Sequence, residues 1–118
     1  MRILLVNTGH PRTIKGGAEA AVLDLAHRLV QRGHAVSLVV HHGGREVERS
    51  VENGVRIHAL PYRNLYFGFG DDAEQRPAPL RLAWHALDSA NPWMAAAFAR
   101  VLDEERPDVV NTHAVAGL

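Results

Sequence analysis

The chain has 118 residues, which is room for one small domain at the usual ~100–200 residues per domain. Its composition, 47% hydrophobic and 22% charged, is near the average of soluble globular proteins and argues against a disordered, collagen-like or coiled-coil chain. Thirteen basic and thirteen acidic residues give a formal net charge of zero, without the excess of positive charge typical of nucleic-acid binders. We therefore expect no nucleic-acid partner.

Cysteine is absent, which excludes disulfide frameworks, thiolate zinc sites and thiol nucleophiles, and fits a reducing compartment. The apolar run after Arg2 is shorter than the ~7–15 residues of a signal-peptide core. No apolar stretch approaches the ~18 residues of a transmembrane helix. We expect a soluble, cytoplasmic protein, and peripheral attachment to the inner membrane face stays open because no basic amphipathic helix or polybasic run decides it.

The first forty residues predict a strand, a helix and a second strand. Residues 3–6 are a continuous apolar run, as in a strand buried on both faces of a parallel sheet. A polar, glycine-bearing stretch follows, and then apolar residues recur at helical spacing as far as Val30, with Gly33 as the expected cap. Residues 36–40 are a second buried strand, so the three elements predict a right-handed βαβ unit.

The middle of the chain is less regular. Residues 55–59 alternate, which predicts a third strand with one wetter face, closed by Pro61. Residues 62–79 have no periodicity, and a loop of that length usually carries function. A helix is expected over residues 80–87.

A last helix and strand complete the predicted domain. Asn91 and Pro92 are a good helix start, and Pro107 forces the helix to end. Residues 108–112 predict a fourth strand. The order β-α-β-β-α-β predicts an α/β fold, an open and mostly parallel sheet with helices on both faces, which we expect to be truncated after the fourth strand.

The candidate binding residues follow the ends of these strands, where open α/β sheets bind ligands. Gly16 and Gly17 come after the first strand. Without Cβ atoms, their backbone can approach a ligand closely, and the N–H groups of the following helix can bind an anion. A tight turn explains two glycines equally well, so both interpretations stay open. The glycine patterns of dinucleotide and P-loop sites are absent.

Histidines gather at the same predicted edge. His113 follows the fourth strand and can donate a hydrogen bond to a phosphate or a sugar hydroxyl. His10, His41 and His42 could converge there, but their spacing matches no common zinc site, so we predict no metal.

Other polar and aromatic residues have structural explanations. Glu19 suits the first turn of the predicted helix through the helix dipole. His58 lies in no motif and is expected to be exposed or hydrogen-bonded. Trp84 and Trp93 lie in apolar helical stretches, so we expect both in the core.

Four segments together resemble the N-terminal half of GT-B-fold retaining glycosyltransferases of the family 4-like group. They are Gly-Gly-Ala-Glu (16–19), Leu-Val-Gln-Arg-Gly-His-Ala-Val (29–36), Asp-Ser-Ala-Asn-Pro (88–92) and Arg-Pro-Asp-Val-Val-Asn-Thr-His (106–113). The resemblance spans nearly the whole chain. It implies that residues 1–118 are a Rossmann-like, N-terminal acceptor-side domain, and that a C-terminal donor-binding domain is missing from them.

The resemblance also implies an activity. A sugar would move from a nucleotide diphosphate sugar donor to an unidentified sugar, lipid or small-molecule acceptor, with retention of anomeric configuration. Gly16 and Gly17 would lie against the donor diphosphate, and His113 would face the transferred sugar as the catalytic residue. The scheme requires neither a metal nor another cofactor, and we expect residues 1–118 to be inactive alone.

The chain departs from the family pattern in two places. Asn111 stands where such enzymes often have histidine, and residues 62–79 show no assignable pattern, so the acceptor is the least determined part. Two alternatives stay open: a non-catalytic module that binds a glycan or an anion at this edge, and another GT-B-fold enzyme such as a nucleotide-sugar epimerase.

Overall fold

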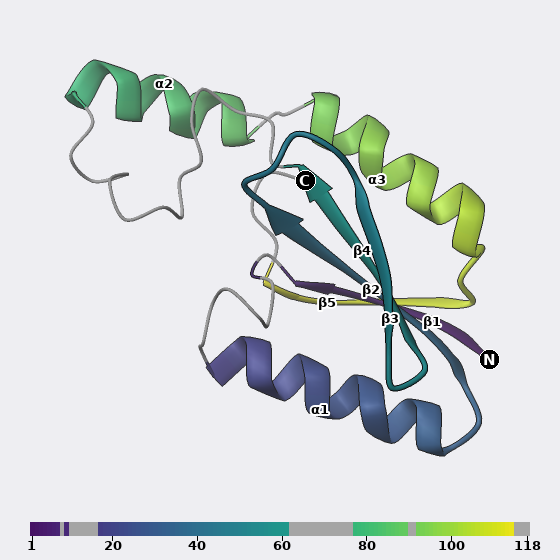
Figure 1. Ribbon diagram of the computed structural model, residues 1–118. Coiled ribbons are helices and arrows are strands. Elements are labelled where there is room, and N and C mark those ends of the chain that lie inside the picture. Colours follow the sequence, from purple (N-terminus) through teal and green to yellow (C-terminus); the bar gives the residue numbers. More distant parts are fainter. Residues whose placement is uncertain (8, 10–16, 62–76, 90–91, 115–118) are drawn as a thin grey trace.

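The computed structural model describes residues 1–7, 9, 17–61, 77–89 and 92–114 (Figure 1). These residues form a five-stranded sheet of order β3-β4-β2-β1-β5, in which β3 alone runs antiparallel to its neighbour. The strands are β1 (Arg2–Asn7), β2 (Ala35–His42), β3 (Glu48–Glu52), β4 (Val55–Pro61) and β5 (Val109–Ala114); the helices are α1 (Gly17–Gln31), α2 (Ala78–Ser89) and α3 (Pro92–Glu105). The predicted open, mostly parallel α/β sheet is confirmed.

One face of the sheet packs against α1. Alternate residues of β1, β2 and β4, such as Leu5, Leu38 and Ile57, contact the buried Val22 and Ala26 of α1. Side chains on a strand point alternately to the two faces, so each buried strand supplies half of its apolar residues to this layer. The other half of the apolar residues in β1 and β2 faces a second helix on the opposite side of the sheet. Because both faces are buried, the apolar sequence of these strands is uninterrupted.

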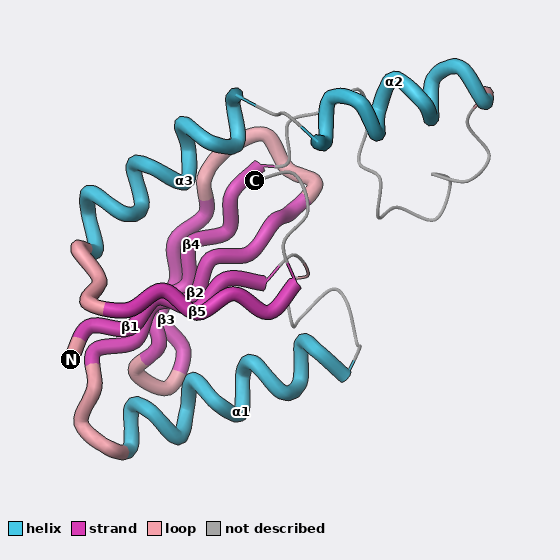
Figure 2. Tube along the Cα trace, turned by 180° about the vertical axis from the view of Figure 1, so that it is seen from behind, coloured by secondary structure: helices cyan, strands magenta, loops and turns pink. Residues whose placement is uncertain are grey.

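That second helix is α3, on the opposite face (Figures 1 and 2). Val6, Val39 and Leu60 pack there against Met94 and Val101 of α3. Helices therefore cover both faces of the sheet, as predicted. Each helix runs antiparallel to the strands that it covers, so the N-termini of α1 and α3 lie at the carboxyl edge of the sheet, where β1, β2, β4 and β5 end (Figure 1).

The end of α1 has the predicted glycine cap. Gly33 has a φ of 88°, its N–H donates to the carbonyl of Val30 at 2.9 Å, and the N–H of His34 donates to the carbonyl of Leu29 at 3.2 Å. These two hydrogen bonds are the Schellman arrangement, which satisfies carbonyls that the last helical turn leaves free.

The structure adds a strand that the apolar pattern did not predict. Edge strand β3 has the sequence Glu-Arg-Ser-Val-Glu and is mostly exposed, so it lacks the buried face that marks the other strands. It pairs with β4 through a two-residue turn at Asn53 and Gly54, with φ values of 49° and 82°. Asn-Gly between two strands is a strong hairpin signal because both turn residues need positive φ. That dipeptide, and not hydrophobicity, could have revealed the strand.

Replacing Gly54 with alanine is expected to destabilise the protein. The residue has positive φ, and a Cβ there would lie 2.9 Å from Cγ1 of Val30 on α1. Strain and overlap together should lower the free energy of unfolding by about 1–2 kcal/mol. Chemical denaturation measures this, with Gly17→Ala as the matched control, since its Cβ would meet no atom within 4 Å. Equal stability of the two variants would contradict the prediction.

The remaining helix, α2, confirms the predicted helix over residues 80–87 and lies apart from both layers (Figures 1 and 2). Its Leu82 is 73% exposed. Most of the predicted loop over residues 62–79, and the predicted cap Asn91, lie outside the described residues. No described helix is both long enough and apolar enough to span a membrane.

Candidate functional site at the carboxyl edge of the sheet

Strand β1 ends at the carboxyl edge of the sheet in a buried polar residue. Asn7 ends β1, and its Nδ2 donates to the carbonyl oxygen of Gly9 at 2.9 Å. A Cβ on Gly9 would lie 2.5 Å from Oε1 of Glu19, so the carboxylate of Glu19 packs against the Gly9 backbone. The start of the β1–α1 connection is thus packed against the first turn of α1. The dipole explanation of Glu19 did not anticipate this contact.

Gly17 is the first residue of α1, whereas the sequence pattern placed the glycine pair in the connection before the helix; Gly16 lies outside the described residues. Gly17 is exposed, and a Cβ built on it would meet nothing within 4 Å. Its φ lies outside the positive range that favours glycine. Neither backbone conformation nor packing against the described residues therefore requires a glycine at this position.

His113 occupies an irregularity in the pairing of β5 with β1. Val6 pairs with Thr112 and Asn7 pairs with Ala114, so His113 is an extra residue on β5. Such a bulge redirects a side chain and is common beside functional sites. The His113 side chain is exposed. Because β5 is the parallel neighbour of β1, His113 lies beside Asn7, at the edge where the chain leaves for α1.

The two histidines at the end of β2 do different things. His41 is buried, and burial together with the charge of neighbouring His42 lowers the pKa of His41 to about 4, so its imidazole is neutral at pH 7. His42 holds the turn after β2: the N–H of Gly44 donates to its Nδ1 at 3.0 Å, and its Nε2 lies 2.6 Å from the carbonyl oxygen of Glu46. His10 lies outside the described residues. Across the described ranges, His, Asp and Glu form no group of three placed to hold a metal ion.

Acid should destabilise the protein through His41. Its pKa is about 4 in the fold against an ordinary 6.5, so the unfolded chain binds a proton first. The contribution of His41 to the free energy of unfolding is therefore fully present above pH 6.5. It is lost as the pH drops toward 4, by about 3 kcal/mol in total. Urea denaturation at a series of pH values measures the slope, which should flatten in His41→Gln. Identical slopes in the two proteins would refute this role.

A second polar cluster lies toward the opposite edge and ties α3 to the sheet. Nε2 of buried His58 on β4 is 2.7 Å from Oε1 of Glu105, whose other oxygen pairs with Arg56. Burial raises the pKa of Glu105, but hydrogen bonds from His58 and Ser37 and the charge of Arg56 outweigh it and leave this pKa below its ordinary value. The expected wetter face of this strand is wrong at His58, because the end of α3 covers it. The cluster is structural and contains none of the predicted site residues.

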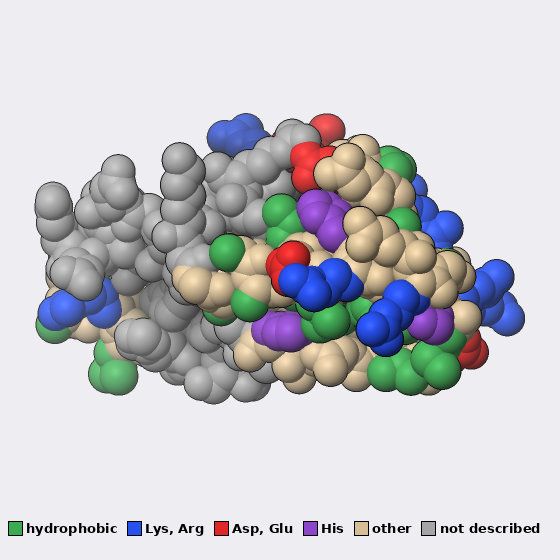
Figure 3. Space-filling view, turned by 90° about the horizontal axis from the view of Figure 1, so that it is seen from below, with side chains coloured by type: hydrophobic (Ala, Val, Ile, Leu, Met, Phe, Trp, Pro, Cys, Tyr) green, Lys and Arg blue, Asp and Glu red, His purple; other side chains and the backbone are tan. Residues whose placement is uncertain are grey.

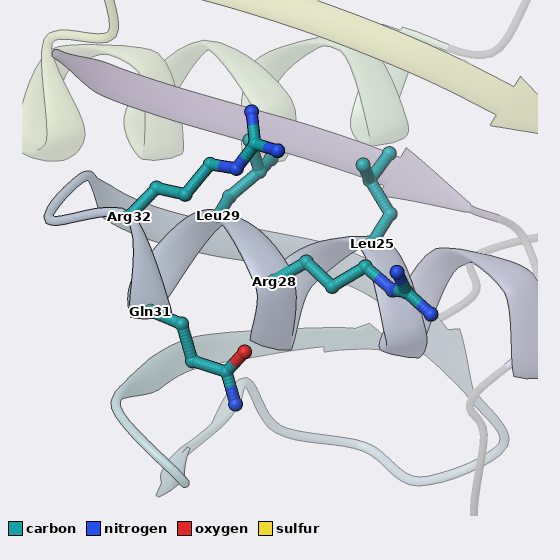
Figure 4. Close-up of a pocket in the computed structure, with 5 residues that line it drawn as sticks. All are labelled: Leu25, Arg28, Leu29, Gln31 and Arg32. Atoms are coloured by element: carbon teal, nitrogen blue, oxygen red, sulfur yellow. The ribbon is translucent and has the colours of Figure 1, made fainter.

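A hollow of about 420 Å³ lies on the flank of α1. Figure 4 shows Leu25 and Leu29 pointing from α1 toward the sheet, with the guanidinium groups of Arg28 and Arg32 beside them. Leu25, Arg28 and Leu29 lie in the second half of α1 and Arg32 directly follows the end of the helix, so the hollow is away from Gly17. Over the described part of the face seen from below, basic side chains are spaced among apolar, acidic and histidine side chains and form no continuous patch (Figure 3).

A smaller groove of about 300 Å³ lies at the carboxyl edge, between α3 and the end of β4. Trp93 lines it and is 53% exposed, so the prediction that this tryptophan belongs to the core is wrong. Successive residues of an α-helix are rotated by about 100° around its axis. Met94, the residue after Trp93, therefore faces another direction and is the one that packs in the core. The side chain of Trp84 is outside the described part of the structure.

Comparisons with known proteins point to one family. Residues 16–117 match the glycosyl transferase 4-like domain. The chain is 36% identical over its full length to a protein of Klebsiella pneumoniae named "Uncharacterized 42.6 kDa protein in cps region", of which it covers 31%. It is 35% identical over 52 residues, 43% of the chain, to 11% of a subunit of the human phosphatidylinositol N-acetylglucosaminyltransferase. No solved structure matches the chain.

The family match covers most of the chain, whereas the chain spans about a third of the Klebsiella relative and about a tenth of the human one. The match begins at Gly16, includes Gly17 and His113, and takes in α1, α2 and α3. The resemblance that the sequence indicated is therefore confirmed, and the chain belongs to the glycosyl transferase 4-like domain family.

Proposed function

We propose that this chain is the N-terminal, acceptor-side domain of a glycosyltransferase that moves a sugar from a nucleotide diphosphate sugar to an acceptor with retention of configuration. Membership of the glycosyl transferase 4-like family supports sugar transfer, and the greater length of the relatives supports a second, donor-binding domain. The absence of cysteine supports the cytoplasm as the compartment.

The observation that carries the proposal is the space in front of Gly17. Gly17 opens α1 without a side chain that could cap the helix or pack against a neighbour, so we look outside the free chain for the reason that a glycine stands here. Ordinary φ and the lack of any atom within 4 Å of its Cβ position remove the conformational and packing reasons. A ligand that approaches the backbone supplies one, and the exposed N-terminus of a 15-residue helix attracts an anion. The donor diphosphate is that anion in our proposal.

The same geometry favours the departure of the leaving group. As the bond between the sugar and the diphosphate breaks, negative charge collects on the diphosphate oxygen. The backbone N–H groups of Gly17 and the rest of the first turn of α1 are held by the helix before the reaction, so they would stabilise that charge without reorganising. The helix dipole of α1 adds to this effect. Glu19 remains on the Gly9 side of the first turn, where its carboxylate packs against Gly9.

His113 is the proposed contact to the transferred sugar. It is exposed at the bulge of β5, beside the strand whose end leads to Gly17. An imidazole N–H there can donate to a sugar hydroxyl and hold the ring with its anomeric carbon toward the acceptor. Orienting two reactants in this way lowers the entropy lost at the transition state.

The test uses the full-length protein that contains this segment. It is incubated with UDP-glucose, UDP-N-acetylglucosamine, UDP-galactose or GDP-mannose, and release of the nucleoside diphosphate is followed with and without a panel of acceptors. Proton NMR of the product gives its anomeric configuration, expected to be that of the donor. An inverted product would overturn the mechanism, and residues 1–118 alone should transfer no sugar.

The same assay separates the alternatives. Binding of a donor without turnover under any acceptor condition would favour a non-catalytic module. Conversion of the nucleotide sugar to a stereoisomer, with no acceptor product, would favour an epimerase.

A further inference from the structure

The groove beside Trp93 has the composition of a binding site. It is lined by Val47, Pro61, Trp93, Ala96, Ala97 and Arg100, and its volume is about 300 Å³. Pocket volumes for small ligands begin near this size, roughly 300 Å³. Trp93 is in the first turn of α3 and Pro61 ends β4, so the groove opens at the carboxyl edge of the sheet, as does the proposed reaction site.

The aromatic end of the groove fits the face of a sugar ring. An exposed tryptophan leaves a large apolar surface in water, and such residues are enriched where proteins bind. The electron-rich face of indole attracts the polarised C–H groups on one face of a pyranose, while the sugar hydroxyls stay in water. Ala96 and Ala97 are small, so they leave room for a ring beside the indole.

The other end of the groove carries a positive charge. Arg100 follows Trp93 by seven residues, which places it about 10 Å further along the helix axis, at 1.5 Å per residue. Arg100 is exposed, and no described carboxylate pairs with it, whereas Arg28, Arg49 and Arg56 each have an acidic partner. A guanidinium group binds carboxylate or phosphate oxygens through two parallel N–H bonds.

We propose that the groove binds a negatively charged saccharide, with one ring on Trp93 and its carboxylate or phosphate on Arg100. The separation of the two side chains is about the span of two linked pyranose rings. Strand β4 is three neighbours from β5 in the sheet, roughly 14 Å at ~4.8 Å per strand, so a saccharide that extends from Trp93 along the edge reaches the vicinity of His113. We assign this saccharide as the acceptor, an assignment that rests on the proposed function.

The experiment measures binding to the full-length protein by calorimetry. The probes are two matched pairs of disaccharides, cellobiose with cellobiouronic acid and N,N′-diacetylchitobiose with the hyaluronan disaccharide, and octyl phosphate as an amphiphile without a sugar. At least one anionic disaccharide should bind about tenfold tighter than its neutral partner, as expected for a charge-assisted hydrogen bond. Octyl phosphate should bind more weakly than that disaccharide.

Three variants and two controls assign the contacts. Arg100→Gln should abolish the tenfold preference for the anionic member. Trp93→Ala should weaken both members of a pair by about tenfold, and Trp93→Phe should retain most of the affinity, since an aromatic face remains. Arg81→Gln and Leu82→Ala, exposed positions on α2, should change nothing. Both groove side chains are exposed, so circular dichroism and thermal unfolding should show an unchanged fold.

The outcomes are distinct. If neither pair binds, if octyl phosphate binds as tightly as the anionic disaccharides, or if Arg100→Gln keeps the preference, the saccharide groove is refuted. If the protein consumes a donor but gives any of these results, the proposed transferase function holds and only the saccharide groove is refuted. Binding of an anionic disaccharide that depends on Trp93 and Arg100, with no donor consumed, leaves the groove standing and refutes the transferase.

Discussion

Replacing Gly17 with valine is expected to abolish productive binding of the nucleotide sugar while leaving the fold intact. A Cβ at this position meets no described atom within 4 Å outside the adjacent residues and the helix's own backbone, and the φ is not strained, so we expect the fold to tolerate the larger side chain. The donor does not, because the diphosphate must come within hydrogen-bonding distance of the backbone where the isopropyl group now stands. Loss of such contacts to developing charge costs about 10²–10³ in rate.

The measurement compares donor affinity, kcat/KM and thermal unfolding across Gly17→Ala and Gly17→Val in the full-length protein. Alanine should be intermediate in activity and should raise stability by about 0.5 kcal/mol, because it restricts the unfolded chain. The opposite directions of the two readouts distinguish a binding role from a structural one. Unchanged activity in Gly17→Val would return the glycine pair to the turn explanation.

Replacing His113 with alanine is expected to lower the rate of sugar transfer by about a hundredfold, the scale of loss when a reacting group is no longer held in position. The side chain is exposed at a bulge of β5, so its removal leaves the core untouched and stability within about 0.5 kcal/mol. Binding of the nucleoside diphosphate alone should be unchanged, because the proposed contact is to the sugar.

The test measures kcat, and the affinities for the nucleotide sugar and for the free nucleoside diphosphate. His34→Gln is the matched control: this histidine follows the α1 cap, at the opposite edge from His113. An equal loss of affinity for the free nucleoside diphosphate would show that His113 binds the diphosphate. An unchanged transfer rate would remove it from the reaction altogether.

Several elements could be predicted from the sequence because their causes are local. The apolar runs of β1 and β2 need only the rule that parallel strands are buried on both faces, and the end of α1 needs only the glycine that closes a Schellman cap. Pro92 starts α3, and Pro107 follows its end at Glu105, as expected from the geometry of proline. Edge strand β3 was not predicted because it buries no face of its own and so has no apolar pattern.

Other features depend on residues that are distant in the sequence. His58 and Glu105 are 47 positions apart, and no spacing rule links them until α3 packs over β4. Trp93 lies in an apolar helix, and composition alone did not say which of its faces meets the sheet. The packing of Met94 and Val101 against the sheet turns Trp93 outward, into a groove that it shares with Val47 and Pro61.

The α/β class of the chain and its resemblance to a glycosyltransferase family were determined by the sequence, because burial periodicity, helix caps and ordered motifs depend on residues that are close together in the chain. Three features needed the tertiary structure: the room in front of Gly17, the bulge that sets His113 beside β1, and the exposure of Trp93. Each depends on which strands become neighbours and which helix face is covered. Those relations arise only when the parts of the chain pack together.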